Sequence, residues 1–173
     1  PYYQDVFARV MIWGIAAVSL NLILGFGGMV SFGHALYLGV AGYVVGIAAY
    51  HDVISGWVQW PLALLAAALV ALVFGAISLR TRGVYFIMIT MALSQMVYFL
   101  TISAEEYGSD DGLVIYERSD FGLEWFDLND ALTLYYLVFS VLLICLYVSW
   151  RLVNSRFGVV TRAARSNEAR VLA

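Results

Sequence analysis

Residues 25–34 have the sequence Gly-Phe-Gly-Gly-Met-Val-Ser-Phe-Gly-His, and they lie between two apolar segments. The four glycines disfavour a helix here, because each costs up to about 1 kcal/mol relative to alanine. The segment is also too apolar for an ordinary water-exposed loop. Non-helical backbone at membrane depth is tolerated only where it is buried in protein or lines a wet cavity. A broken or re-entrant membrane segment fits this sequence, and so does a simple glycine-rich turn.

The composition on both sides of this segment indicates a membrane protein. Of the 173 residues, 63% are hydrophobic and 12% are charged, whereas a typical soluble domain carries roughly 25% charged residues. A helix that crosses a bilayer needs about 20 mostly apolar residues. We therefore predict an all-α integral membrane protein with about five transmembrane helices, at residues 6–25, 35–50, 58–79, 84–103 and 131–150.

The charges outside these spans predict their orientation. Arg80 and Arg82 lie between the third and fourth spans, and five arginines follow the fifth span. The positive-inside rule makes both segments cytoplasmic. Residues 104–130 carry nine acidic side chains and one arginine, so we expect an acidic external loop. The chain then divides into a transmembrane domain, residues 1–150, and a cytoplasmic segment, residues 151–173.

Polar and small residues within or beside the spans are candidates for a substrate pathway, because broken helices in transporters expose backbone groups to a substrate. The candidates are Asn21, Gly27, Gly28, Ser31, His34, Thr90, Ser94 and Gln95. Interhelical hydrogen bonding is the simpler interpretation of the hydroxyls and amides, and packing is the simpler one for His34. Small residues spaced four apart predict close helix packing; they are the pairs Ala35 and Gly39, and Gly42 and Gly46, and the series Ala67, Ala71 and Gly75.

We found no motif for catalysis, metal binding or nucleic-acid binding. The sequence has no lysine and therefore no P-loop, and a single histidine such as His34 is not a metal site. A net charge of −3 disfavours nucleic acid as a partner. No span carries an acidic side chain, which disfavours a proton-coupled carrier. We expect neither a catalytic residue nor a cofactor in this chain.

Four blocks of the sequence resemble one family when they are taken together and in this order. They are LNLILGFGGMVSFGHA at residues 20–35, LRTRGVYFIMIT at 79–90, GSDDGL at 108–113, and SRFG at 155–158 with RAARSNE at 162–168. They resemble the permease subunits of branched-chain amino acid ABC importers, of the LivM type. Such permeases have further spans upstream and downstream, so we expect the chain to be a fragment of a longer protein.

The resemblance implies a function and a set of partners. Residues 1–150 would be a permease domain that translocates branched-chain or related hydrophobic amino acids across the bacterial cytoplasmic (inner) membrane. Residues 151–173 would be a truncated coupling segment. Its predicted contacts with the ATPase are Arg162, Arg165, Asn167 and Glu168. The implied partners are ABC ATPase subunits that carry ATP and magnesium, a second permease of the LivH type, a periplasmic substrate-binding protein and membrane lipid.

Other functions remain open at this point. Close relatives in the family carry urea or short amides. A channel or secondary carrier could use the glycine-rich segment as its filter, although the coupling-type tail speaks against it. A membrane anchor without a pathway is a further alternative, and the polar residues of the fourth span speak weakly against it. Intramembrane catalysis is the least favoured, because the sequence offers no nucleophile–base pair.

Overall fold

The computed structural model describes residues 2–109, 112, 113, 115, 118–122, 128 and 130–166. Its elements are the helices α1 (Tyr2–Asn21), α2 (Ala35–Tyr50), α3 (Gly56–Ser78), α4 (Val84–Ile102), α5 (Ala131–Val153) and α6 (Arg156–Ser166), with a π-helical turn η1 (Leu22–Phe26) and a short 3₁₀ helix η2 (Glu105–Tyr107). Within these residues, extended backbone is paired only in the isolated bridge between Ser55 and Asp120. The prediction of an all-α protein is confirmed.

Four helical segments are long and apolar enough to cross a bilayer. They are Tyr3–Phe26, Gly56–Ser78, Val84–Ile102 and Ala131–Val153. The remaining predicted span corresponds to α2, which is apolar but has 16 residues. At 1.5 Å per residue α2 is about 24 Å long, less than the roughly 30 Å of a hydrocarbon core. The division at residue 150 into a permease domain and a coupling segment stays a prediction.

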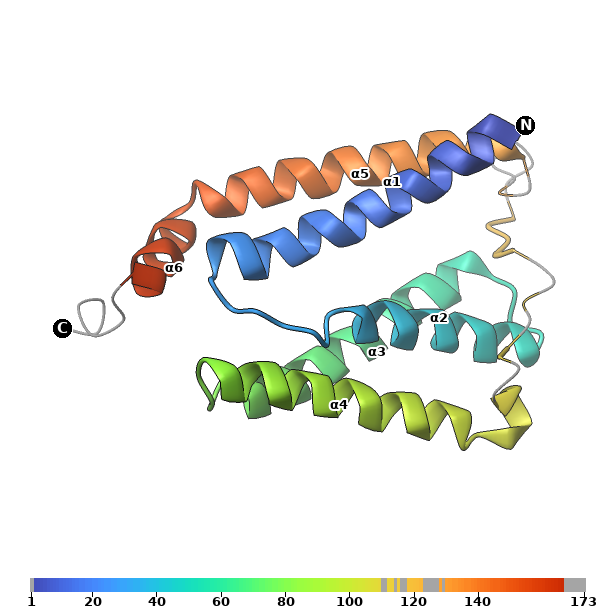
Figure 1. Ribbon diagram of the computed structural model, residues 1–173. Coiled ribbons are helices and arrows are strands. Elements are labelled where there is room, and N and C mark those ends of the chain that lie inside the picture. The colour runs from blue at the N-terminus through green and yellow to red at the C-terminus, as the bar shows by residue number, and fades with distance from the viewer. Residues whose placement is uncertain are drawn as a thin grey trace. The chain divides into compact units, whose positions relative to one another are not determined.

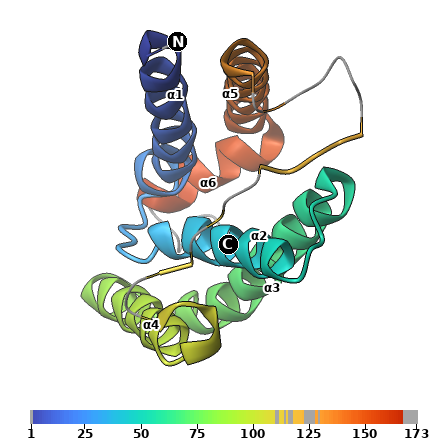
Figure 2. The same ribbon diagram turned by 90° about the vertical axis from the view of Figure 1, so that its right-hand side faces the viewer.

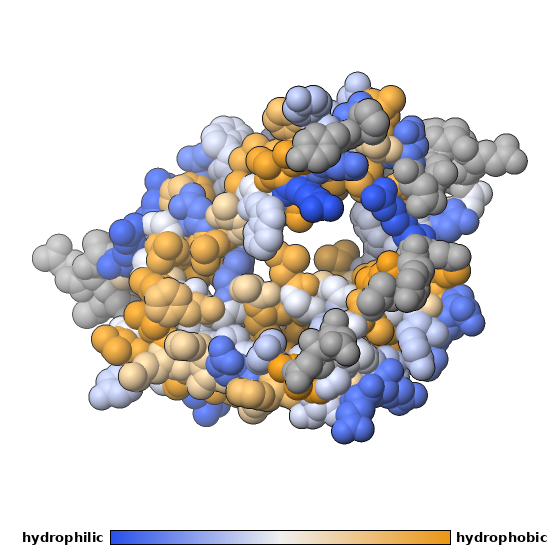
Figure 3. Space-filling view, turned by 45° about the vertical axis from the view of Figure 1, so that its right-hand side comes forward, coloured by the Kyte–Doolittle hydropathy of each residue, from blue (hydrophilic) through white to orange (hydrophobic). Residues whose placement is uncertain are grey.

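Large apolar side chains are exposed along these helices. On α3, Leu64, Leu65, Leu69 and Leu72 are between 63% and 71% exposed. Hydrophobic residues, in orange, also cover much of the face seen in Figure 3. Exposed apolar area on this scale marks a surface that is covered by lipid or by another protein. Together with the four long apolar helices, it identifies a multi-pass membrane protein.

The chain forms two compact units. Unit 1 comprises residues 1–30 and 129–173. In this unit α1 and α5 lie side by side (Figures 1 and 2). Ala8 of α1 and Val138 of α5 are buried, and a Cβ added to Gly14 would lie 3.8 Å from Leu142. After a turn at residues 154–155, α6 packs against α5 and η1.

Unit 2 comprises residues 31–128 and contains α2, α3 and α4, which all pack against one another. Among the described residues of this unit, the most buried large side chain is Gln59 of α3, which is 1% exposed. The Gln59 amide donates to the carbonyl of Val53 at 2.7 Å and accepts a hydrogen bond from the Ser119 hydroxyl. The Asp120 carbonyl accepts from the Gly56 amide at 2.7 Å. These bonds hold the described residues of the loop after α4 against the beginning of α3.

The glycines of α2 and α3 do not make the close helix packing that their spacing predicts. No described atom lies within 4 Å of a Cβ built on Gly39, Gly42 or Gly75. At Gly46 the neighbour is the Leu113 side chain, which belongs to a loop rather than to a helix. The prediction of close helix packing at these glycines is therefore wrong within the described part of unit 2. The space beside Gly39 belongs instead to a pocket.

Candidate functional site

The predicted pathway residues are divided between the two units. Asn21, Gly27 and Gly28 lie in unit 1, and Ser31, His34, Thr90, Ser94 and Gln95 lie in unit 2. Each group belongs to a separate packing environment.

The first group lies where α1 loosens into a π-helical turn. The Gly27 amide donates to the Leu22 carbonyl at 3.2 Å, five residues back, which closes η1. The Asn21 side chain lies against Gly25, because a Cβ on Gly25 would overlap the Asn21 amide. Helical backbone thus continues to Phe26, and the break between α1 and α2 covers residues 27–34 rather than 25–34. π-helical turns of this kind occur frequently at functional sites.

Arg165, in the last turn of α6, contacts this π-helical turn although it lies 140 positions later in the sequence. Its Nη1 atom donates a hydrogen bond to the carbonyl oxygen of Gly25. Its aliphatic stem lies against Gly28, where an added Cβ would be 2.7 Å from the arginine Cγ atom. Gly28 has a φ angle of +69°, which residues other than glycine rarely adopt. The glycine-rich segment and the tail, which are far apart in sequence, therefore meet in one place.

Arg162 also donates hydrogen bonds to backbone carbonyls of this chain. Its Nη2 atom donates to the Val153 carbonyl at 3.1 Å, and its Nε atom donates to the Gly158 carbonyl at 3.3 Å. A cation at the Val153 carbonyl stabilises the end of α5, where the helix dipole is negative. The other two predicted coupling residues, Asn167 and Glu168, lie outside the described residues.

The second group begins with the residues that lead into α2. Gly33 passes so close to α4 that an added Cβ would lie 2.5 Å from the carbonyl oxygen of Thr90. His34 follows directly and precedes the first residue of α2. Burial lowers the pKa of the His34 imidazole, and its ring makes an edge contact with the Tyr37 ring at 5.9 Å between centroids. The segment and α4 are therefore in direct contact at the beginning of α2.

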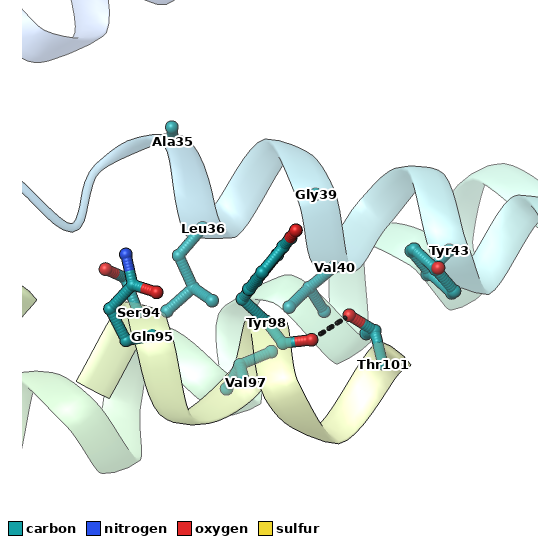
Figure 4. Close-up of a pocket in the computed structure, with 10 residues that line it drawn as sticks. All are labelled: Ala35, Leu36, Gly39, Val40, Tyr43, Ser94, Gln95, Val97, Tyr98 and Thr101. Carbon is teal, nitrogen blue, oxygen red and sulfur yellow. Dashed lines mark hydrogen bonds between the residues drawn. The ribbon is translucent and has the colours of Figure 1, made fainter. Parts of the chain in front are cut away.

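Ser94 and Gln95 line a pocket between α2 and α4. The pocket has a volume of about 280 Å³. Its lining comprises Ala35, Leu36, Gly39, Val40 and Tyr43 from α2, and Ser94, Gln95, Val97, Tyr98 and Thr101 from α4. Figure 4 shows Leu36 and Val40 pointing toward α4, and the ring of Tyr98 pointing toward α2. The α2 side is thus apolar except for the Tyr43 hydroxyl, and the α4 side carries the hydroxyl and amide groups of Ser94, Gln95, Tyr98 and Thr101.

The hydroxyls of α4 donate to their own helix. Thr90 donates to the Ile87 carbonyl at 3.0 Å, and Ser94 donates to the Met91 carbonyl at 2.8 Å. The Thr90 and Ser94 hydroxyls therefore do not donate hydrogen bonds to another helix, which is the simpler interpretation of the sequence. Their oxygen lone pairs can still accept a hydrogen bond from an ammonium group, while the exposed Gln95 amide can both donate and accept.

Sequence reasoning missed the whole α2 side of this pocket, and it also missed Val97, Tyr98 and Thr101 on the α4 side. Ser94, Tyr98 and Thr101 follow one another at helical spacing, and that spacing is the signal that could have found Tyr98. The sequence pattern predicts a packing role for Gly39, because a small residue in a membrane helix has that role most often. Among the described residues, no group of three metal-ligating side chains gathers in either unit.

Comparison with known proteins assigns the family. The sequence profile described as branched-chain amino acid transport system / permease component matches residues 2–173. Two similar proteins are the high-affinity branched-chain amino acid transport system permease proteins LivM of Salmonella typhimurium and Escherichia coli. Each is 25% identical over 186 residues, which cover 95% of this chain and 44% of the relative. The chain therefore spans less than half the length of these relatives. No solved structure matches it significantly. Because the profile covers nearly every residue, the chain belongs to the family of permease components of branched-chain amino acid transport systems.

Proposed function

We propose that this chain is part of a permease that imports branched-chain or related hydrophobic amino acids, driven by ATP that a partner subunit hydrolyses. The family and the names of the two relatives support the substrate class. The transporter would lie in the bacterial inner membrane. ABC ATPase subunits with bound Mg-ATP, a second permease subunit and a periplasmic substrate-binding protein would complete it.

The observation that carries this proposal is the pocket between α2 and α4. Its volume of about 280 Å³ lies near the lower end of the range for small-molecule sites, roughly 300–1,000 Å³. Leu36 and Val40 offer apolar contacts to an aliphatic side chain. Ser94 and Gln95 offer hydrogen-bond partners to an ammonium or a carboxylate. A branched-chain amino acid has this same division between an apolar end and a charged end.

We further propose that α6 meets the ATPase through the face that is turned away from Arg162 and Arg165. Those two side chains point to carbonyls of the chain itself. Arg156, Val159 and Val160 lie on the opposite face at helical spacing, and all three are exposed. A helix with exposed apolar and basic side chains suits a groove on a partner protein. Asn167 and Glu168 would extend this docking segment.

Uptake of labelled leucine into proteoliposomes that contain the purified complex tests the substrate pocket. Gly39→Leu would fill the pocket, whereas the matched variant Gly42→Leu puts the same side chain on the same helix outside the pocket lining. We expect Gly39→Leu to reduce uptake at limiting leucine about tenfold or more, the effect of losing about 1.4 kcal/mol of binding. Gly42→Leu should stay within about twofold of the unsubstituted protein, well below that effect.

Three results would contradict the proposal. Equal loss in both variants would remove the pocket from the pathway. Competition by urea with no competition by isoleucine or valine would move the substrate to short amides. Leucine uptake that needs neither ATP nor the ATPase would make the protein a channel or secondary carrier.

For the docking face, Arg156→Glu should abolish co-purification of the ATPase, while Gly42→Leu should retain it.

A further inference from the structure

We propose that Arg165 is a positioning residue that ties α6 to the glycine-rich segment at the end of α1, so that a movement of α6 reshapes that segment. The contact itself follows from the geometry of unit 1. Its consequence for transport rests on the proposed function. Arg165 would then act inside the permease, on the path from the ATPase to the membrane, rather than on the surface of the ATPase.

The first argument concerns the carbonyl that Arg165 binds. In a continuous α-helix, the carbonyl of Gly25 would accept from the amide of Met29, four residues on. The Met29 amide instead donates to the Ile23 carbonyl at 3.2 Å, because the chain loosens through η1. Arg165 supplies a donor to Gly25 in place of that amide. The guanidinium therefore stabilises the loosened form of the helix end in preference to a regular α-helix.

The second argument is steric. The stem of Arg165 occupies the position that a side chain on residue 28 would need, since an added Cβ would be 2.7 Å from Cγ and 3.0 Å from Cδ. Gly28 also has its positive φ angle at this point. The arginine thus touches the segment twice, through its charged end at Gly25 and through its stem at Gly28. Two contacts from one side chain fix the direction of the segment as well as its distance from α6.

The third argument is that α6 is held firmly at its other end. Arg162 bonds to the Val153 carbonyl, the last residue of α5. The Ser155 hydroxyl donates to the Leu152 carbonyl at 2.6 Å and accepts from the Gly158 amide at 3.3 Å. A helix that is fixed to α5 at its first turn and to η1 at its last turn transmits a displacement to both. Arg165 is the side chain that makes the second of these connections.

Hydrogen–deuterium exchange of the full protein in detergent tests the contact without any need for transport. In Arg165→Met, which keeps the stem and removes the donors, amides 22–30 should exchange about five- to tenfold faster, because a charge-assisted hydrogen bond is lost. Arg165→Lys keeps one charged donor and should restore most of the protection. Arg156→Met, on the opposite face of α6, should leave amides 22–30 unchanged. Unchanged exchange in Arg165→Met would overturn the inference.

Leucine uptake per ATP hydrolysed tests the consequence in the reconstituted complex. Arg165→Met should keep the ATPase bound and hydrolysing while uptake per ATP falls about tenfold, the effect of a coupling free energy of about 1.4 kcal/mol. Arg165→Lys should recover most of it. A normal ratio in Arg165→Met, with faster exchange in residues 22–30, would overturn the coupling role. If the unsubstituted complex imports no leucine, the proposed function fails, and the exchange experiment still decides the contact.

Discussion

Replacing Gln59 by leucine should release residues 118–122 from the beginning of α3. Gln59 is the buried centre of this contact, because its amide bonds both to Val53 and to Ser119. Leucine has a similar volume, so little of the effect would come from a cavity. The change therefore removes two hydrogen bonds and leaves the packing of the site nearly unaltered.

The expected magnitude follows from the bond to Ser119, because it is the one that joins the loop to Gln59, while the bond to Val53 lies within the connection between α2 and α3. A typical intramolecular hydrogen bond contributes a net of about 1 kcal/mol, so its loss destabilises the docked loop by about 1 kcal/mol. Since 1.4 kcal/mol corresponds to a factor of ten, the population of the released loop should rise about fivefold. Ser119→Ala removes the same bond from the other side and should raise that population by about the same factor.

Amide exchange reports this release directly. The amide of Asp120 donates to the Ile54 carbonyl at 2.9 Å only while the loop is docked. Its exchange rate should increase in proportion to the released population in Gln59→Leu. The control is Gln95→Leu, which changes an exposed glutamine in the same unit. Exchange at Asp120 within about twofold of the unsubstituted protein would refute the claim that Gln59 holds the loop, because even one lost bond predicts more.

Three further predictions use thermal unfolding in detergent. Gly28→Ala forces a residue with a side chain into a left-handed conformation at a cost of about 1–2 kcal/mol. The melting temperature should therefore fall by roughly 2–8 °C. In the control Gly39→Ala the new methyl group points into open space, so the melting temperature should not fall. Gly33→Ala should destabilise by about 1–3 kcal/mol, because its Cβ would press on the Thr90 carbonyl; an unchanged melting temperature would contradict this contact. Burial lowers the pKa of the His34 imidazole in the folded protein. As the pH falls below about 6.5, the imidazole is therefore protonated in the unfolded chain before it is protonated in the folded protein. The folded state thus has its full stability above that pH and loses stability below it. The melting temperature of His34→Gln should therefore change less between about pH 7.5 and pH 5.5 than that of the unsubstituted protein.

The helices could be predicted from sequence because lipid imposes one simple requirement. A membrane segment must bond its own backbone groups, so an apolar run of sufficient length is a helix. This rule located the runs that became α3, α4 and α5. It said less about α2, where 16 apolar residues stand between a glycine-rich segment and the polar pair His51 and Asp52. A run of that length is equally typical of a buried core helix.

Tertiary contacts could not be predicted, because they depend on which segments meet. Gln59 appears in the sequence as one polar residue at the beginning of an apolar run, and its partners lie 6 and 60 positions away. Arg165 appears as a surface cation of a short amphipathic segment, and nothing local indicates a carbonyl 140 positions earlier. The glycine at position 39 shows the same limit. Its spacing fits helix packing and a pocket wall equally well, and only the placement of α4 decides between them.

The pairing of α1 with α5 has a consequence for biosynthesis. Within unit 1, α1 packs against η1 and against α5, which follows roughly a hundred residues later. At a translation rate of about 5–20 residues per second, α5 is synthesised roughly 5–20 s after α1. During that interval α1 lacks α5, and its face with Gly14 must be covered by something other than α5. Mutations on that face would then reduce the yield of inserted protein before they could affect transport.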